Sequence, residues 1–316
     1  MKECLQLKKE YAELEKLKVE FESAFDESVK TGKTKKTKQL KTEIEQKLAS
    51  LREKIIPKEI KAVWTNPETK EQKEIIFNIQ ERIQEWQEFN QKHNLPIPSE
   101  QEIKKIFQKN KAEIQKEMET YGYDNILIIP ENLPDNENLH QKMTKNYNAT
   151  WQSSNFKEGG GFTGAKHTEN QKTKIILCHN DQNIYDNPEA NVFEKATLRK
   201  NILQLSGLTE QEIQQKIQNQ ENIPVNFETS INGKTVKVQA EGLSLNEYLI
   251  FQKQYQEKNR KHLDESGWTW LLKTFSASRV VLSDWSAVGG RLDVDAGGSG
   301  YSDGSLPCRL SRSFEN

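Results

Sequence analysis

Four of the ten aspartates of this chain lie close together near its C-terminal end, namely Asp284, Asp293, Asp295 and Asp303. Clustered carboxylates could bind calcium, which takes about six to eight oxygen ligands in a set geometry. Tyr301 and many serines and glycines lie among them. Short polar side chains with tyrosine also build many protein-recognition surfaces. The segment therefore indicates either a cation site or a surface for recognition.

The composition of this tail differs sharply from the rest of the chain. Residues 1–273 contain 38 Lys, 36 Glu and 25 Gln, whereas residues 274–314 contain none of these and no Met. The tail nevertheless holds four of the eight Arg and six of the sixteen Gly. A Gly-rich β region with tight turns would exclude long side chains. The second explanation is genetic, and we favour it: AAC-type codons mutated at their adenines give Leu, Val, Ser, Ala, Tyr, Asp, Gly and Arg, but never Lys, Glu, Gln, Met or Trp.

Four short motifs make the genetic explanation specific. They are the run Ser278-Arg279-Val280-Val281, the lone Trp285, the Arg291-Leu292 step and the closing segment from Cys308 to Phe314. Together they resemble the tail of variable proteins that diversity-generating retroelements mutate, and those proteins carry a C-type-lectin-like fold. The resemblance is strongest over residues 261–314 and weaker back to residue 121. One departure is Pro307, where the family pattern has Gly before the Cys.

The resemblance implies a ligand-binding protein that is the target of mutagenic homing, with a variable tail at 279–308 and no enzymatic activity. No cofactor is expected, and no metal, because residues that are free to vary cannot guarantee a calcium geometry. The implied variable, ligand-binding surface comprises Leu282, Asp284, Ser286, Val288, Gly289, Asp293, Asp295, Gly298, Gly300, Tyr301, Asp303 and Ser305. The implied scaffold comprises Trp268, Trp270, Arg279, Trp285, Arg291, Cys308, Arg309, Arg312 and Phe314. Arg309 and Arg312 are expected to pair with acidic or carbonyl groups.

Alternation along the tail predicts which way its side chains point, because successive residues of a strand face opposite sides. The apolar set predicted to point inward is Leu292, Val294 and Ala296, with Val281 and Trp285 on the preceding strand. The set predicted to share the outer face is Asp293 and Asp295, with Leu282, Asp284 and Ser286 beside each other on the preceding strand.

The elements that must position this tail divide the chain into three parts. Residues 1–58 form a helical hairpin or coiled coil, since apolar residues such as Tyr11, Leu14, Phe21 and Leu40 recur mostly at spacings of three and four. Residues 59–121 form a small β-hairpin plus helices, and residues 122–316 form the C-type-lectin-like domain. The predicted class is therefore α+β with a helical, partly coiled-coil N-terminal region. Residues 1–56 either mediate self-association or form a solvated hairpin.

Composition and charge limit the classes of partner that this chain is expected to bind. The chain has 316 residues, a net charge of −1 and 34% hydrophobic residues, so nucleic acid is not an expected partner and no window is apolar enough to span a membrane. The N-terminus lacks a signal-peptide pattern, which makes the cytoplasm the default location. Display on a cell surface or virion stays open. The expected partner is an unknown ligand, a protein or a cell-surface molecule.

Two rival functions remain. One is a coiled-coil structural or assembly protein whose β-rich tip is passive. The other is an enzyme, because formylglycine-generating enzymes resemble the same fold; that chemistry needs a closely arranged Cys pair, and the tail offers only Cys308. The Cys178-His179 pair lacks a third catalytic partner in the sequence. The Gly159–Gly164 run lacks the Lys and hydroxyl residue of a phosphate-binding loop.

Overall fold

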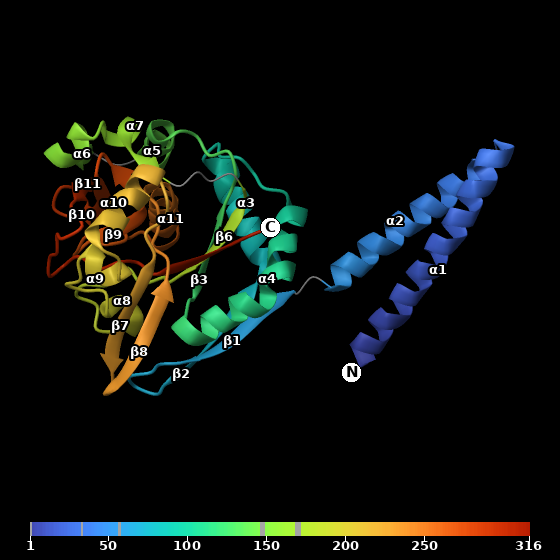
Figure 1. The fold of residues 1–316 in the computed structure, drawn as a ribbon, viewed down its shortest axis with the longest axis horizontal. Coiled ribbons are helices and arrows are strands. Elements are labelled where there is room, and N and C mark those ends of the chain that lie inside the picture. Colours follow the sequence, from blue (N-terminus) through green and yellow to red (C-terminus); the bar gives the residue numbers. More distant parts are fainter. Residues whose placement is uncertain (1, 33, 56–57, 146–148, 168–171) are drawn as a thin grey trace. The chain divides into compact units, whose positions relative to one another are not determined.

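The computed structural model describes residues 2–32, 34–55, 58–145, 149–167 and 172–316. The chain divides into two compact units, Met1–Lys58 and Glu59–Asn316. Its secondary structure is mixed α+β with helices at the N-terminal end, as the sequence predicts (Figure 1). Along the described ranges, no helix combines the length and the apolarity needed to cross a membrane.

The first unit is a hairpin of two helices, α1 (Lys2–Thr31) and α2 (Lys35–Ile55). Leu14, Ala24 and Leu40 are its buried hydrophobic residues among the side chains that are described, and Lys47 forms an ion pair with Glu13 between the helices. The side chains of residues 1–7 and 49–57, which carry both ends of the predicted apolar stripe, lie outside the described residues. The hairpin thus has a small core of its own.

The second unit begins with the predicted hairpin, β1 (Glu59–Thr65) and β2 (Gln72–Asn78), followed by α3 (Ile79–Lys92) and α4 (Glu100–Tyr121). Ser99 caps α4 by accepting from the Glu102 amide, as its sequence pattern predicts. These elements share the core of the following segment, since the Trp86 indole N–H donates to the Ile126 carbonyl at 2.9 Å. Residues 59–121 therefore pack within the same unit as residues 122–316.

A three-stranded antiparallel sheet joins the two ends of residues 122–316. Its order is β12 (Ser311–Glu315), β6 (Lys174–Cys178) and β3 (Asn125–Ile129). Every residue of β3 is buried, which matches the continuous apolar run of its sequence. Ser311 pairs with Cys178, so the last strand of the chain is hydrogen-bonded to β6, which precedes it by more than 100 residues in the sequence.

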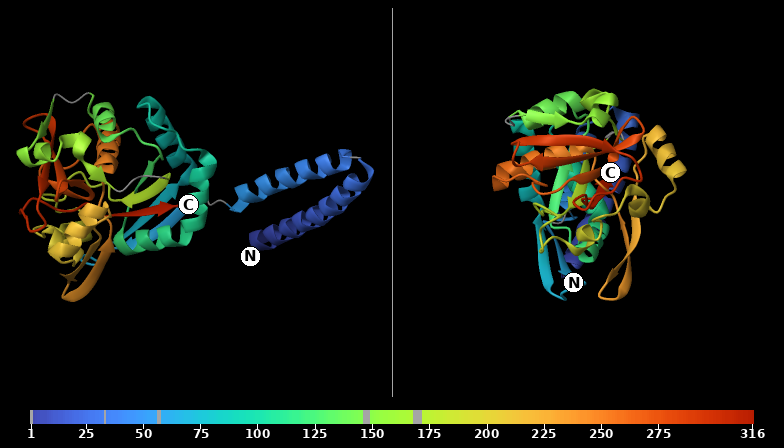
Figure 2. Two further views of the ribbon diagram at one scale, coloured as in Figure 1. Left: turned by 45° about the horizontal axis from the view of Figure 1, so that its top comes forward. Right: turned by 90° about the vertical axis from the view of Figure 1, so that its left-hand side faces the viewer.

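A five-stranded sheet carries the tail. Its order is β4 (Ala149–Gln152), β11 (Arg291–Gly297), β10 (Arg279–Ser286), β9 (Thr269–Ser276) and β5 (Lys166–His167). The β4–β11 pair is parallel, and the other pairs are antiparallel. Figure 2 shows this sheet with the tail strands in red, beside the helices of the middle of the chain.

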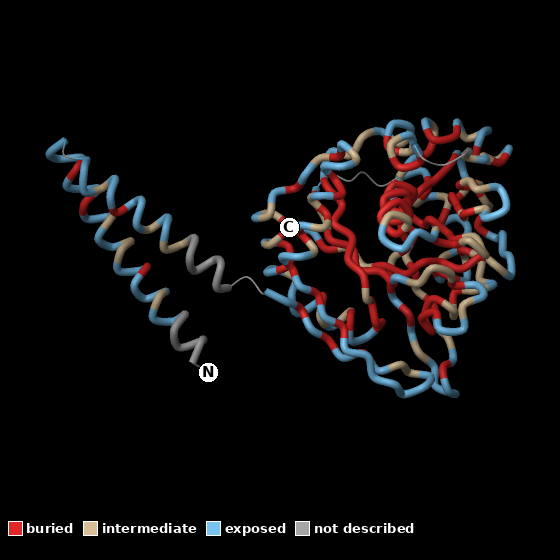
Figure 3. The backbone as a smooth tube through the Cα atoms, turned by 180° about the vertical axis from the view of Figure 1, so that it is seen from behind, coloured by how far each residue is buried: buried red, intermediate tan, exposed pale blue. Residues whose placement is uncertain are grey.

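The remaining elements connect and cover these sheets. The short helices are α5 (Asn136–Thr144), α6 (Ser154–Glu158), α7 (Gly161–Gly164), α8 (Val192–Lys195), α9 (Ile202–Ser206) and α10 (Glu210–Asn219). The hairpin of β7 (Val225–Ile231) and β8 (Lys234–Ala240) turns at Asn232-Gly233, a residue pair typical of two-residue hairpin turns. Helix α11 (Leu245–Asn259) is buried along residues 245–255 and lies inside the unit (Figure 3).

Candidate functional site

The candidate site is built on the outer face of the β10–β11 pair. The register places Asp284 opposite Asp293, Leu282 opposite Asp295 and Ser286 opposite Arg291. In an antiparallel pair, residues directly opposite project to the same side. The structure therefore gathers six side chains of the tail on one face, five of which the sequence assigns to the variable surface.

The inner face of the same strands packs against the core. Val281, Trp285, Leu292, Val294 and Ala296 are all buried, so the inward direction predicted for each of them is confirmed. Trp285 is also held from its backbone, because its amide donates to the Asp264 carbonyl at 3.1 Å. The His262 ring stacks on the Trp285 ring with centroids 3.4 Å apart. The sequence offered no sign of that contact, since nothing in the Lys261-His262 segment marks a partner for a tail residue.

Two positions on the outer face differ from the expectation. Leu282 is only 3% exposed, so its placement beside Asp284 on an exposed surface is wrong. Leu282 stands opposite Trp270 of β9, next to Gly297 at the end of β11. The Trp268 and Trp270 amides donate to the Ser305 and Pro307 carbonyls of the segment after β11 at 3.0 Å.

Asp293 is the second correction, because it lies on the predicted face but is only 9% exposed. Its Oδ1 accepts from Arg291 Nε at 2.8 Å. Trp151 of β4 stands opposite Asp293 in the parallel ladder and is itself 39% exposed. Trp151 is a member of this face that was not predicted from the sequence. An aromatic residue at a strand position with a polar neighbour on each side was the signal that could have identified it.

Asp284 has an unusual protonation state for an aspartate of a protein surface. Burial, followed by the nearby carboxylates of Asp293 and Asp264, raises the pKa of Asp284 to about 8. Its Oδ1 is buried and accepts no hydrogen bond from the described residues. The folded structure therefore favours the protonated form of Asp284.

Oδ1 of Asp295, unlike Oδ1 of Asp284, accepts hydrogen bonds from described residues. Its Oδ1 accepts from the hydroxyl of Ser153 and from the Ala296 amide, at 2.6 Å in the second case. Ser153 also caps α6, because it accepts from the Phe156 amide at 3.1 Å. Asp295 thus joins β11 to the segment after β4 and stays half-buried.

The most exposed members of the predicted surface lie in the turns that β10 and β11 lead into. Val288, at the β10–β11 turn, is fully exposed, and Tyr301 is 49% exposed. Asp303 accepts from the Ser305 amide at 2.8 Å and from its hydroxyl at 2.6 Å. These local hydrogen bonds order the end of the loop, and they involve no buried core residue. The other exposed members are Gly289, Gly298 and Gly300.

The Trp270 indole forms the base on which this loop rests. Trp270 is fully buried, and its ring meets the Tyr301 ring edge-on at 6.2 Å between centroids. A Cβ on Gly297 would lie 2.7 Å from the Trp270 ring, so only glycine fits there as the chain leaves β11. Trp270 therefore acts as the core wall that the sequence predicts, whereas Trp268 precedes β9 and is half-buried.

The two arginines of the last segment find the partners expected for them. Arg309 is 1% exposed and holds Asp264 with Nε and Nη2, both at 2.9 Å. It also donates to the carbonyls of Asp181 and Gln182 at 2.8 Å. Arg312 makes a partly exposed ion pair with Glu113 at 3.4 Å. Of the other scaffold positions, Arg279 pairs with Glu158 at 3.6 Å, while Cys308 and Phe314 are buried.

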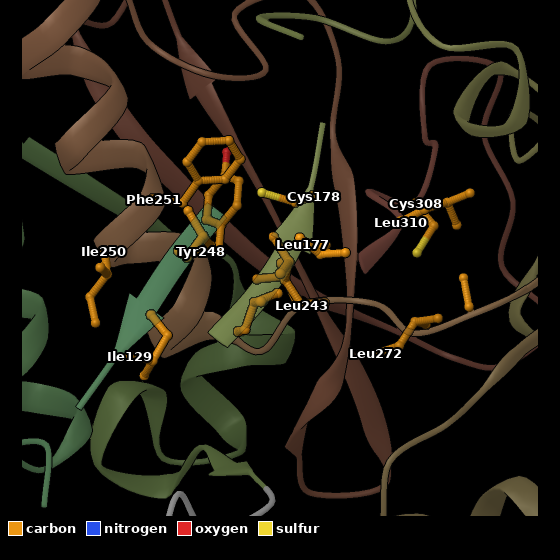
Figure 4. Close-up of a cluster of buried hydrophobic side chains, with 14 of the residues drawn as sticks. Ile129, Leu177, Cys178, Leu243, Tyr248, Ile250, Phe251, Leu272, Cys308 and Leu310 are labelled. Carbon is orange, nitrogen blue, oxygen red and sulfur yellow. The ribbon is translucent and has the colours of Figure 1, made fainter. Parts of the chain in front are cut away.

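The two free cysteines that are described, Cys178 and Cys308, are both buried among apolar side chains (Figure 4). Burial raises the pKa of each thiol well above its ordinary value. Among the described residues, no group of three or more His, Cys, Asp or Glu side chains is arranged to hold a metal ion.

Comparison with known proteins finds no family model, no curated protein and no solved structure that matches this chain. What the chain does must therefore be argued from its own residues.

Proposed function

We propose that this chain is a ligand-binding protein that displays a diversified recognition surface on a fixed scaffold. The observation that carries the proposal is a division by burial. Of the twelve positions assigned to the surface, ten are exposed or half-buried, and only Leu282 and Asp293 are buried. Six of those twelve are exposed, whereas none of the nine scaffold positions is exposed: five are buried and four are half-buried. Residues outside the core can change with little effect on stability, which a diversified surface requires.

The chemistry of the accessible positions supports recognition of a protein or a cell-surface molecule. Short side chains, glycines and Tyr301 limit the conformational entropy that binding would cost. Asp284, as a carboxylic acid, adds a donor in a partly desolvated setting. The surface thus offers an aromatic ring, hydroxyls, carboxylates and one neutral acid within a single part of the fold.

The retroelement origin and the C-type-lectin-like fold belong to this proposal as well. The support for them is the set of tail motifs and the pairing of the last strand, β12, with β6. The scaffold residues Trp270, Arg309 and Phe314 occupy buried positions. In this α+β unit the final strand, β12, pairs with β6, so the tail lies between elements of the scaffold.

The rival functions have less support. An oxidase that uses a Cys pair needs reactive thiolates, and burial raises the pKa of the Cys308 and Cys178 thiols. A passive tip leaves the distinct composition of the tail without a role.

The proposal is tested by sequencing the C-terminal coding region from many individuals of the source population, with the flanking DNA. We expect substitutions at the ten accessible surface positions, matched to adenines of a nearby near-copy. The nine scaffold positions serve as the internal control and should stay constant. An invariant tail with no near-copy and no reverse transcriptase gene nearby would overturn the diversified surface.

A direct binding test complements the gene survey. A library randomised at Asp284, Ser286, Val288, Tyr301 and Ser305 is selected against a panel of unrelated proteins. A matched library randomised at five exposed positions of α10, for example Gln211 and Gln215, is selected in parallel. We expect binders to come from the first library alone, and equal yields from both would contradict a specialised surface.

A further inference from the structure

Helix α1 exposes hydrophobic side chains that α2 does not cover. Tyr11, Val19, Phe25 and Val29 are 58%, 66%, 50% and 71% exposed. Single exposed apolar residues are ordinary on a surface, whereas a set that lines one face marks an interaction site. The spacing along the helix therefore decides what these residues mean.

Four residues of α1 follow a symmetric spacing. Tyr11, Lys18, Glu22 and Val29 are separated by seven, four and seven positions. At about 100° per residue, these positions fall within roughly 40° of one another on the helix. Phe25 lies on the edge of the same face, and its ring contacts the Phe21 ring at 6.2 Å between centroids. We call this set the α1 face.

The α1 face is complementary to itself in one orientation. If a second α1 lies antiparallel about an axis near Glu20, Tyr11 stands opposite Val29 of the second copy and Lys18 opposite Glu22 of the second copy. Each pair occurs twice, as a two-fold axis demands. A parallel arrangement would instead place Lys18 against Lys18 and Glu22 against Glu22, which is unfavourable.

We infer that α1 is the dimerisation element of this protein and that its partner is α1 of a second, antiparallel copy. The side of α1 that packs on α2 through Leu14 and Ala24 lies next to the α1 face, about 60–140° around the helix, so a partner must come to the α1 face from outside the hairpin. Two hairpins joined in this way form a four-helix bundle, which buries more apolar surface than one hairpin can. The inference does not depend on what the tail binds.

Charge exchange in the full-length protein tests the pairing by sedimentation equilibrium. Lys18→Glu and Glu22→Lys each replace both attractive contacts with repulsive ones, so each should raise the dimer dissociation constant about tenfold or more. An equimolar mixture of the two variants should dimerise as tightly as the unmodified chain, because the heterodimer restores opposite charges. The double variant K18E/E22K should also recover.

Matched controls lie on the far side of the same helix. Lys16→Glu and Glu27→Lys make the same charge changes about 120–140° away from the α1 face, and they should leave the dissociation constant unchanged. Helix content by circular dichroism separates loss of pairing from loss of the hairpin. A monomer at all concentrations would overturn the inference. So would a dimer that ignores K18E and E22K, or a mixture that associates no better than either variant alone.

Discussion

Arg309 holds both carboxylate oxygens of Asp264 at 2.9 Å inside a site where both side chains are almost fully buried. Two of the three remaining guanidinium hydrogens go to backbone carbonyls, and the Tyr248 hydroxyl donates to the same carboxylate at 3.1 Å. The contact joins the last segment of the chain to the loop before β9. It therefore fixes the ends of the segment that carries the proposed surface.

Arg309→Met should lower the free energy of unfolding by about 3–5 kcal/mol, because it leaves Asp264 buried without its charge partner. Arg312→Met is the matched control, since the Arg312–Glu113 pair is partly exposed, and it should cost at most about 1 kcal/mol. Urea unfolding of both variants measures the difference. Equal costs would show that the Arg309 contact does not hold the tail in place.

Asp284 should make the protein less stable as pH rises. Its pKa is raised to about 8, chiefly by burial and then by Asp293. The folded state therefore favours the protonated acid, and that contribution is complete below about pH 4 and lost as pH approaches 8. The loss should be roughly 1–3 kcal/mol after allowing for solvent screening.

Asp284→Asn should flatten the stability profile between pH 5 and pH 8, because asparagine has the same shape and does not ionise. Chemical unfolding of both proteins at each pH gives the comparison. Asp303→Asn serves as the control, since the pKa of Asp303 is lowered by hydrogen bonds from Ser305. A profile that is unchanged by Asp284→Asn would assign the pH dependence to other groups.

Adjacent glycines at the end of β11 should respond differently to the same change. A Cβ on Gly297 would lie 2.7 Å from the Trp270 ring and 3.3 Å from Leu282, whereas a Cβ on Gly298 would meet nothing within 4 Å. Gly297→Ala should cost about 1–3 kcal/mol through overpacking, and Gly298→Ala should stay within about 0.5 kcal/mol of the unmodified protein. Thermal unfolding of the two variants decides whether the boundary between scaffold and surface lies between Gly297 and Gly298.

Glu247 should govern acid lability. Burial opposes its ionisation, but the ammonium groups of Lys174 and Lys273 prevail and lower the pKa of Glu247 to about 2. The stabilisation is present above about pH 4.5 and is lost as pH falls towards 2. Glu247→Gln should thus cost roughly 2–4 kcal/mol at pH 7 and much less near pH 2. Glu212 occupies the same capping position in α10 but is exposed, so Glu212→Gln should show a much weaker pH dependence.

Local features of this fold could be predicted from the sequence because their causes lie within a few residues. Asn232-Gly233 supplies the positive φ angles that a two-residue hairpin turn needs, and both residues adopt them. Ser244 and Glu247 stand three positions apart, the spacing of a capping box, and they form that box at the start of α11. Alternation alone placed Leu292 on the inner face of β11.

Long-range features could not be predicted because no local pattern encodes them. The parallel pairing of β4 with β11, which sets Trp151 opposite Asp293, joins segments far apart in the chain. Leu282 sits on the side of β10 that alternation indicates, yet it is buried beside Trp270 of the neighbouring strand and Gly297 at the end of β11. Periodicity determines the face of a strand on which a residue lies, but not what covers that face.

Leu282 and Val288 allow the sharpest test of where the accessible surface begins, because the sequence assigns both to the variable set while their exposed fractions are 3% and 104%. Val288→Asp should change the free energy of unfolding by less than about 0.5 kcal/mol, since the side chain touches water in either case. Leu282→Asp should cost more than about 3 kcal/mol, because it buries a charge beside Trp270. Denaturant unfolding of the pair measures both values, with Leu282→Ala separating the lost packing from the buried charge. If Leu282→Asp proves as harmless as Val288→Asp, the Leu282 position is open to water in solution, and the recognition surface extends inward along β10.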